Sequence, residues 1–213
     1  MKKIFLLSAL FLLFASIALF AQTSLTLEKV CTALATRPNT CGDFIQIKTI
    51  SSNGRQLKSS GSFIISPLGI MWKTEKPFPS SLILTEDSMI QIAANGNKSV
   101  MDGKDNQTFS NISATLSSIF SGNAEALKAN FEYKLTDAAN GTWALSLQPK
   151  DSTIASVMKE VKLSGTISEN RSTASLDSLE ISESSNNTIH YDFLNQKYPE
   201  ELSADEKQNF IAY

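Results

Sequence analysis

The chain has 213 residues, of which 42% are hydrophobic, and its 19 basic and 21 acidic side chains give a formal net charge of −2. This balance gives no support for a nucleic-acid partner, and the length fits one domain with a sizeable core. No long charged or proline-rich linker divides the chain, so a single domain is expected.

The N-terminus has the pattern of a secretory signal peptide over residues 1–21. A basic start is followed by the apolar run Ile4–Phe20 and by Ala21, a small residue at the expected cleavage site. An uncleaved membrane anchor is the alternative, but no basic stop-transfer flank follows the run. Cleavage would leave residues 22–213 with 17 basic and 21 acidic side chains, a net charge of about −4. No cysteine lies near the cut for acylation, so a soluble, exported protein is expected.

A short amphipathic helix is predicted over Thr26–Ala35, with Cys31 on it, and Cys41 opens the strand that follows. Because an oxidising compartment preserves disulfides, we expect a Cys31–Cys41 disulfide that joins the helix to the sheet. A redox or metal-binding pair is the alternative. The spacing is not C-x-x-C and the lone His190 is distant, which disfavours that alternative.

The first half of the chain is predicted to form an antiparallel meander. Gly54 and Asn95-Gly96 supply the turn residues that return one strand into the next. The predicted strands are Cys41–Ile50, Gln56–Ile65, Ile70–Thr74, Leu82–Thr85, Met89–Ala93 and Lys98–Met101.

The second half begins with a helical insertion, Asn111–Phe131, in which apolar residues recur at helical spacing. Strand patterns then return, and a short helix after Asp151 and a closing helix with its cap at Ser203 interrupt them. The predicted strands are Tyr133–Asp137, Thr142–Gln148 and three alternating stretches around Val161–Ile167, Leu179–Ile181 and Ile189–Phe193.

This order of elements predicts a mainly β (α+β) fold. Antiparallel strands with one apolar face must cover that face, and only a few short helices are available to do so. We therefore expect an unclosed, strongly curved antiparallel barrel or sheet, with a short helical lid over an apolar cavity.

The chain lacks the usual catalytic motifs: it has no G-x-S-x-G elbow, H-E-x-x-H helix, Walker loop or dinucleotide fingerprint. Strand alternation puts His190 on the same face as Asp192, which permits an acid–base pair. A solvated strand histidine is the simpler interpretation. We expect a binding protein with no cofactor and no metal.

One spaced pattern consists of a G-x-F-x-Q-x-K strand beginning at Gly42, an S-G-x-F strand beginning at Ser60, a turn at Pro67 leading to a strand with Trp72, and Pro77. This pattern resembles the periplasmic outer-membrane lipoprotein carrier family, LolA. The pattern covers residues 42–92 best. Beyond it, the element order and the closing stretch from Phe193 to Phe210 are also similar.

The resemblance implies a periplasmic chaperone that binds the acyl chains of lipoproteins, and a monomer is assumed by default. It would receive them from an inner-membrane ATP-driven extractor and pass them toward an outer-membrane acceptor. Exposing an acyl chain to water costs about 0.8 kcal/mol per methylene, which is the physical reason for a carrier. A carrier of another amphiphile and a lipoprotein-sensing protein are the alternatives. Many members carry an Arg before the turn proline, where this chain has Ser66, so the lid must be controlled differently or the cargo must differ.

The predicted ligand-binding residues come from two sources. By resemblance, Ile70 and Trp72 face the cavity, while Leu116, Ile119 and Phe120 belong to the lid. By strand alternation, Phe63, Leu82, Leu84, Ile90, Ile92, Trp143, Leu145 and Leu147 join them. Ordinary core packing is the alternative for every one of these residues.

Overall fold

A computed structural model describes residues 24–85, 88–102, 117–119, 121–138 and 140–211. The predicted signal peptide, residues 1–21, lies outside the described residues, as do Leu116 and Phe120 of the predicted lid. Within the described ranges, no helix combines the length and the apolar character that crossing a membrane requires.

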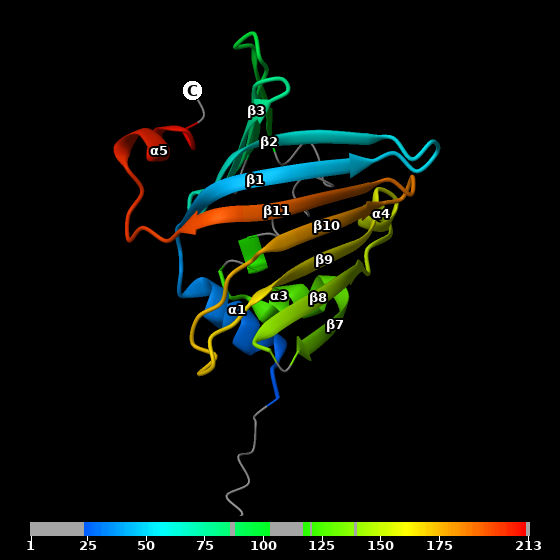
Figure 1. Cartoon of the computed structure of the whole chain (residues 1–213), viewed down its shortest axis with the longest axis vertical. Helices are drawn as coiled ribbons and strands as arrows, with labels where there is room; N and C mark the ends of the chain where they lie inside the picture. The colour runs from blue at the N-terminus through cyan, green and yellow to red at the C-terminus, as the bar shows by residue number, and fades with distance from the viewer. Residues whose placement is uncertain (1–23, 86–87, 103–116, 120, 139, 212–213) are drawn as a thin grey trace, which may run out of the picture.

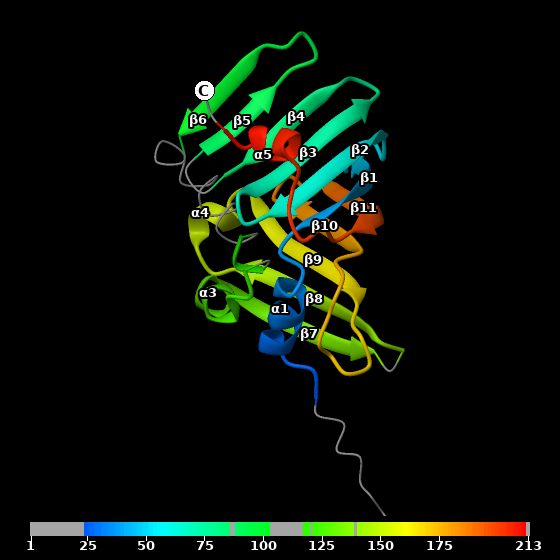
Figure 2. The ribbon, with the colours of Figure 1, turned by 90° about the vertical axis from the view of Figure 1, so that its left-hand side faces the viewer.

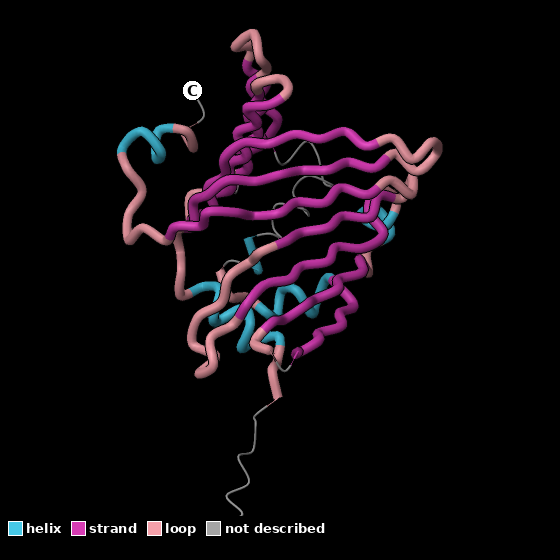
Figure 3. Tube along the Cα trace, viewed as in Figure 1, coloured by secondary structure: helices cyan, strands magenta, loops and turns pink. Residues whose placement is uncertain are grey.

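Strands make up half of the described residues, and the helices are short (Figure 3). The strands are β1 (Thr40–Thr49), β2 (Gln56–Ser66), β3 (Gly69–Lys76), β4 (Ser80–Leu84), β5 (Ser88–Ile92), β6 (Lys98–Asp102), β7 (Phe131–Ala138), β8 (Thr142–Pro149), β9 (Met158–Thr166), β10 (Ser178–Glu183) and β11 (Thr188–Lys197). The helices are α1 (Leu27–Ala35), α3 (Ala124–Asn130), α4 (Ser152–Ala155) and α5 (Ala204–Gln208).

All eleven strands form one sheet in the order β6-β5-β4-β3-β2-β1-β11-β10-β9-β8-β7. Every neighbouring pair is antiparallel, and the only step out of chain order places β11 beside β1. β6 and β7 form the two edges, so the sheet does not close into a barrel (Figure 1). The predicted open antiparallel sheet is confirmed.

Two short helices begin where the sequence places a capping side chain. The Thr26 side chain accepts a hydrogen bond from the Lys29 backbone N–H and starts α1, which buries an apolar stripe that includes Val30 and Leu34. Ser203 and Glu206 form a capping box at the start of α5. These caps satisfy backbone donors that a helix start leaves free, which helps such short helices to form.

The sheet is strongly curved near β1 and β2, where glycines face phenylalanines across the strands. Gly42 lies opposite Phe63, and Phe44 lies opposite Gly61. A Cβ on Gly42 would be 2.9 Å from the Phe63 ring, and one on Gly61 would overlap the carbonyl oxygen of Lys73. Gly42 therefore leaves room for the Phe63 ring, and Gly61 allows β3 to approach β2 closely.

Apolar residues gather on both faces of this sheet. One face carries a large cluster, which α1 and α3 cover at the β7–β9 half (Figure 2). The other face carries a smaller cluster at the β3–β4 end, beside α5. The Trp72 and Tyr191 rings of the large cluster lie 6.1 Å apart. Their strands β3 and β11 are three positions apart in the sheet, a separation of about 14 Å in a flat sheet. Because side chains converge on this face, we call it the concave face and the other the convex face.

The predicted Cys31–Cys41 disulfide is not formed, and both cysteines are free. Cys31 is buried in the concave cluster, whereas Cys41 packs against the cluster on the convex face. Successive residues of a strand point to opposite faces, and Gly42 already belongs to the concave side. Cys41 therefore points away from α1, and the prediction was wrong.

Candidate functional site: the concave apolar face

The concave face carries one continuous apolar cluster, which we call the concave cluster. It joins both halves of the sheet to α1, α3 and the short stretch at Ile119. It contains Leu27, Val30, Cys31, Leu34, Phe44, Phe63, Ile65, Ile70, Leu84, Ile119, Ala124, Leu127, Phe131, Trp143, Leu145, Leu147, Ile154, Met158, Val161, Leu163, Leu179 and Phe193, among others. An apolar face of this extent is the feature that a lipid-binding site requires.

Aromatic rings occupy the centre of the concave cluster, where the sheet bends. The Phe63 and Phe193 ring centroids lie 4.8 Å apart, and Phe44 and Tyr191 lie 5.9 Å apart. Tyr191 also stacks with Phe193 at 6.2 Å. Burial raises the pKa of Tyr191 to about 12, so its hydroxyl keeps its proton. These rings supply a large apolar surface with a polar group at its edge.

The cluster is not fully covered. Trp72, Leu82 and Met89 on β3–β5, and Ile181 and Tyr191 on β10 and β11, pack against it but remain partly exposed. These residues extend the apolar face beyond the part that is sealed.

Most of the predicted ligand-binding residues come together on the concave face. Buried in the cluster are Phe63, Ile70, Leu84, Ile119, Trp143, Leu145 and Leu147, and Trp72 and Leu82 lie at its partly exposed margin. Their placement in one apolar surface does not by itself separate a ligand site from a core, because both require the same residue types.

Ile90 and Ile92 are separated from this group and lie on the convex face. The β4–β5 register pairs Ile83 with Ile90 and Leu84 with Met89, so Met89 is the β5 residue that packs against the concave cluster. The alternation in β5 permits either assignment, because apolar side chains occur on both of its faces. The expectation that Ile90 and Ile92 face the cavity was wrong.

Several residues of the concave face were not predicted. Phe44 lies within the G-x-F pattern, and Tyr191 and Phe193 lie in an alternating stretch, so strand periodicity could have identified all three. Leu163 and Leu179 extend the same surface across β9 and β10. Whether α1 lies over the concave or the convex face could not be read from the sequence.

The helices over the concave face are held by few polar contacts. Lys128 of α3 forms ion pairs with Glu28 of α1 and with Glu125 at 2.9 Å. The hydrogen bond from Lys128 lowers the pKa of Glu28 to about 2. The Lys128 and Glu28 side chains are 33% and 49% exposed, so solvent screens this link between the helices.

The C-terminal end of α1 is attached to the segment between β9 and β10. The Ala174 backbone N–H donates to the Ala33 carbonyl at 3.1 Å, and the Arg37 guanidinium donates to the Ala174 carbonyl at 3.3 Å. Ser66, where family members often carry an arginine, acts only locally. Its hydroxyl accepts from the Leu68 N–H at 3.1 Å and donates to the Gly69 carbonyl at 3.4 Å.

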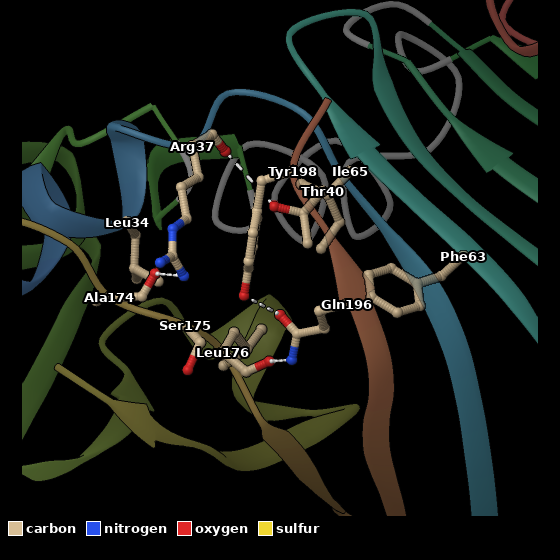
Figure 4. Close-up of a pocket in the computed structure, with 10 residues that line it drawn as sticks. All are labelled: Leu34, Arg37, Thr40, Phe63, Ile65, Ala174, Ser175, Leu176, Gln196 and Tyr198. Atoms are coloured by element: carbon tan, nitrogen blue, oxygen red, sulfur yellow. Dashed lines mark hydrogen bonds between the residues drawn. The ribbon is translucent and has the colours of Figure 1, made fainter. Parts of the chain in front are cut away.

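A small pocket of about 10 Å³, room for roughly one water molecule, lies beside this attachment and is partly open to solvent (Figure 4). Leu34, Phe63 and Leu176 of the concave cluster form part of its wall. Arg37 lies 3.9 Å from the Tyr198 ring centroid, and the Tyr198 hydroxyl donates to Gln196 at 3.0 Å. The pocket thus has an apolar interior and a polar rim.

His190 lies on the opposite, convex face. Its Nε2 is 3.1 Å from Asp192 and its Nδ1 is 3.7 Å from Glu180, as expected for neighbours on a strand face. The imidazole is 36% exposed, and its neighbours are surface carboxylates. Among the residues that the structure describes, no three His, Cys, Asp or Glu side chains come close enough to hold a metal ion.

These features define a class of protein: an open antiparallel sheet whose concave face is apolar and is covered by helices from separate parts of the chain. The family model for the outer membrane lipoprotein carrier protein LolA matches residues 39–207. The match spans most of the chain, so the chain belongs to the LolA family.

The chain is similar to solved structures at very low sequence identity. A DUF1329 family protein from Desulfovibrio piger has 9% identity and a TM-score of 0.50, with 83% of this chain and 92% of that chain covered. A LolA superfamily protein from Nitrosomonas europaea has 8% identity and a TM-score of 0.43, with 84% and 94% covered. No curated protein matches the sequence significantly.

Proposed function

We propose that the protein is a periplasmic carrier that shelters the acyl chains of lipoproteins. It would take them from an inner-membrane ATP-driven extractor and deliver them toward the outer membrane. The observation that carries the proposal is the continuous apolar concave face with its partly exposed margin at Trp72, Leu82 and Met89. Membership of the carrier family supports it.

The physical reason is the cost of moving acyl chains through water, about 0.8 kcal/mol for each exposed methylene. A carrier must bury the chains and later release them. The polar links of the covering helices are screened ion pairs and a few hydrogen bonds. The main cost of opening is therefore the apolar contact of side chains such as Val30 and Leu34, which a bound acyl chain would replace. Ligand binding would therefore displace the cover, because most of the cluster is buried in this state.

The first test is to incubate the purified protein with spheroplasts of its host and to identify the bound molecules in the soluble fraction by mass spectrometry. Acylated lipoproteins in a one-to-one complex support the proposal. Free lipids without lipoproteins would replace it with an amphiphile carrier. Recovery of the protein without any lipid would contradict both.

Two matched variants link capture to the concave face. Leu82 and Ile92 lie on adjacent strands, are both partly buried, and point to opposite faces. Leu82→Glu should abolish capture because a charge on the concave face opposes acyl chains, and Ile92→Glu should retain it. Equal capture by both variants would contradict the assignment of the concave face.

The proposal also predicts that His190 takes no part in transfer. His190→Ala should capture and release lipoprotein at the rate of the unmodified protein. A loss of transfer in this variant would favour a catalytic role for His190 and Asp192.

A further inference from the structure

The two tryptophans of the chain differ in how their indole N–H groups are used. Trp143 is 1% exposed, and its Nε1 donates to the Thr166 carbonyl at 3.1 Å. The Nε1 of Trp72 is also buried, but among the residues that the structure describes it meets no hydrogen-bond acceptor. A buried donor without a partner is costly and uncommon in folded proteins. The apolar character of the cluster does not explain why the indole N–H of Trp72 is buried there without an acceptor.

The surroundings of Trp72 are apolar on the concave face. Trp72 lies directly opposite Phe63 on β2 and Leu82 on β4, and its ring lies near Tyr191 across the bend of the sheet. A water molecule held at such a place would need two or more polar partners. Tyr191 is the nearby ring with a hydroxyl, and burial keeps that hydroxyl protonated.

We propose that Trp72 donates its indole N–H to the carbonyl oxygen of the ester or amide that joins a bound acyl chain to its head. This inference rests on the proposed function and adds a ligand class: acyl esters and amides rather than bare hydrocarbon. A carbonyl is a neutral acceptor on an apolar chain, so it can enter the cluster without bringing a charge. A free carboxylate would have to give up its hydration there.

The direct test observes the indole protons of protein labelled with ¹⁵N-tryptophan. Two indole signals are expected, and Trp72→Phe assigns them. On addition of methyl hexadecanoate, the Trp72 indole proton should shift downfield, as hydrogen bonding requires. Hexadecane should bind without that shift, and the Trp143 signal should not show it with either probe. An equal shift with both probes, or none with the bound ester, would overturn the inference.

The same experiment separates this inference from the proposed function. If radiolabelled hexadecane and methyl hexadecanoate both fail to co-elute with the protein in gel filtration, the carrier proposal fails, and the inference fails with it. If both bind but the Trp72 signal does not distinguish them, only the inference fails.

Affinities give a second readout. Trp72→Phe should weaken binding of methyl hexadecanoate about tenfold, the loss expected for one buried hydrogen bond, and change binding of hexadecane by less than about twofold. Trp143→Phe is the matched control, since it removes a similar volume but breaks an internal hydrogen bond. It should lower the melting temperature while leaving the ratio of the two affinities unchanged. An equal loss of both affinities in Trp72→Phe would show a packing role only.

Discussion

The two faces of the sheet bury apolar side chains in different ways. On the concave face, the cover comes from helices that are far apart in the sequence, and an aromatic margin remains partly exposed. On the convex face, Ile64, Met71, Ile83 and Ile90 lie under Leu202 and Phe210 of one C-terminal segment. We call this second group the convex cluster.

The segment that leads into α5 is attached to the start of β1 by side-chain hydrogen bonds. The Asn39 side chain is nearly buried and donates to the Pro199 and Glu200 carbonyls at 3.2 and 2.9 Å. The capping box stabilises the start of α5 itself. The convex cluster is thus small and lies under one C-terminal segment, whereas the concave cluster is larger, is covered by helices from separate parts of the chain and keeps a partly exposed margin.

The largest effect is expected at the bend of the concave face. A methyl group on Gly61 would overlap the Lys73 carbonyl oxygen, and that backbone atom cannot move without disturbing the β2–β3 pairing. Gly61→Ala should lower the free energy of unfolding by about 3 kcal/mol, measured by urea denaturation. Gly96→Ala is the control: its φ is +81° with open space around it, so it should cost only about 1 kcal/mol. Equal losses would show that the bend does not depend on close strand approach.

A smaller loss of stability is expected on the convex face. Leu202 is 5% exposed and belongs to the cover, so Leu202→Ala should reduce the free energy of unfolding by about 2 kcal/mol. Capture of acylated cargo by the folded protein should stay unchanged, because the concave face is intact. A loss of capture at full folding would contradict the separation of the two faces.

The two cysteines lie on opposite faces of the sheet, and thiol chemistry tests this placement. Burial raises the pKa of Cys31 to about 11, and burial also raises the pKa of Cys41. Both thiols should therefore react slowly with iodoacetamide in the native protein at pH 8, since the thiolate is the nucleophile. Non-reducing denaturation should release two free thiols per chain. A mass two units lower, with no thiol detected, would show that the cysteines are bridged.

The arrangement of strands could be predicted well because local signals determine it. Alternating apolar residues and turns such as Asn95-Gly96 place most strand ends within about two residues of those observed. The amphipathic pattern over Thr26–Ala35 likewise places α1 within one residue of its observed bounds. These features depend on neighbours in the sequence, which a single chain displays directly.

The use of each face could not be predicted in the same way. Ile90 and Cys41 lie on the convex side because a segment more than a hundred residues later covers Ile90 and packs near Cys41. Both faces of β5 are apolar in sequence, so periodicity alone gives no decision. The unpartnered Trp72 indole also depends on packing across the bend, which only the folded chain reveals.

The smallest effect is expected at the ion pair between the helices over the concave face. The pKa of Glu28 lies near 2, below its ordinary value of 4.5, chiefly because of the hydrogen bond from Lys128. Its contribution to stability is therefore complete above pH 4.5 and is lost as the pH falls toward 2. Glu28→Gln should lower the melting temperature slightly at pH 7 and not at pH 2, because the pair is exposed. The same variant should speed the capture of acylated cargo at pH 7 if the helices are displaced on binding. An unchanged capture rate would place the opening elsewhere on the concave face.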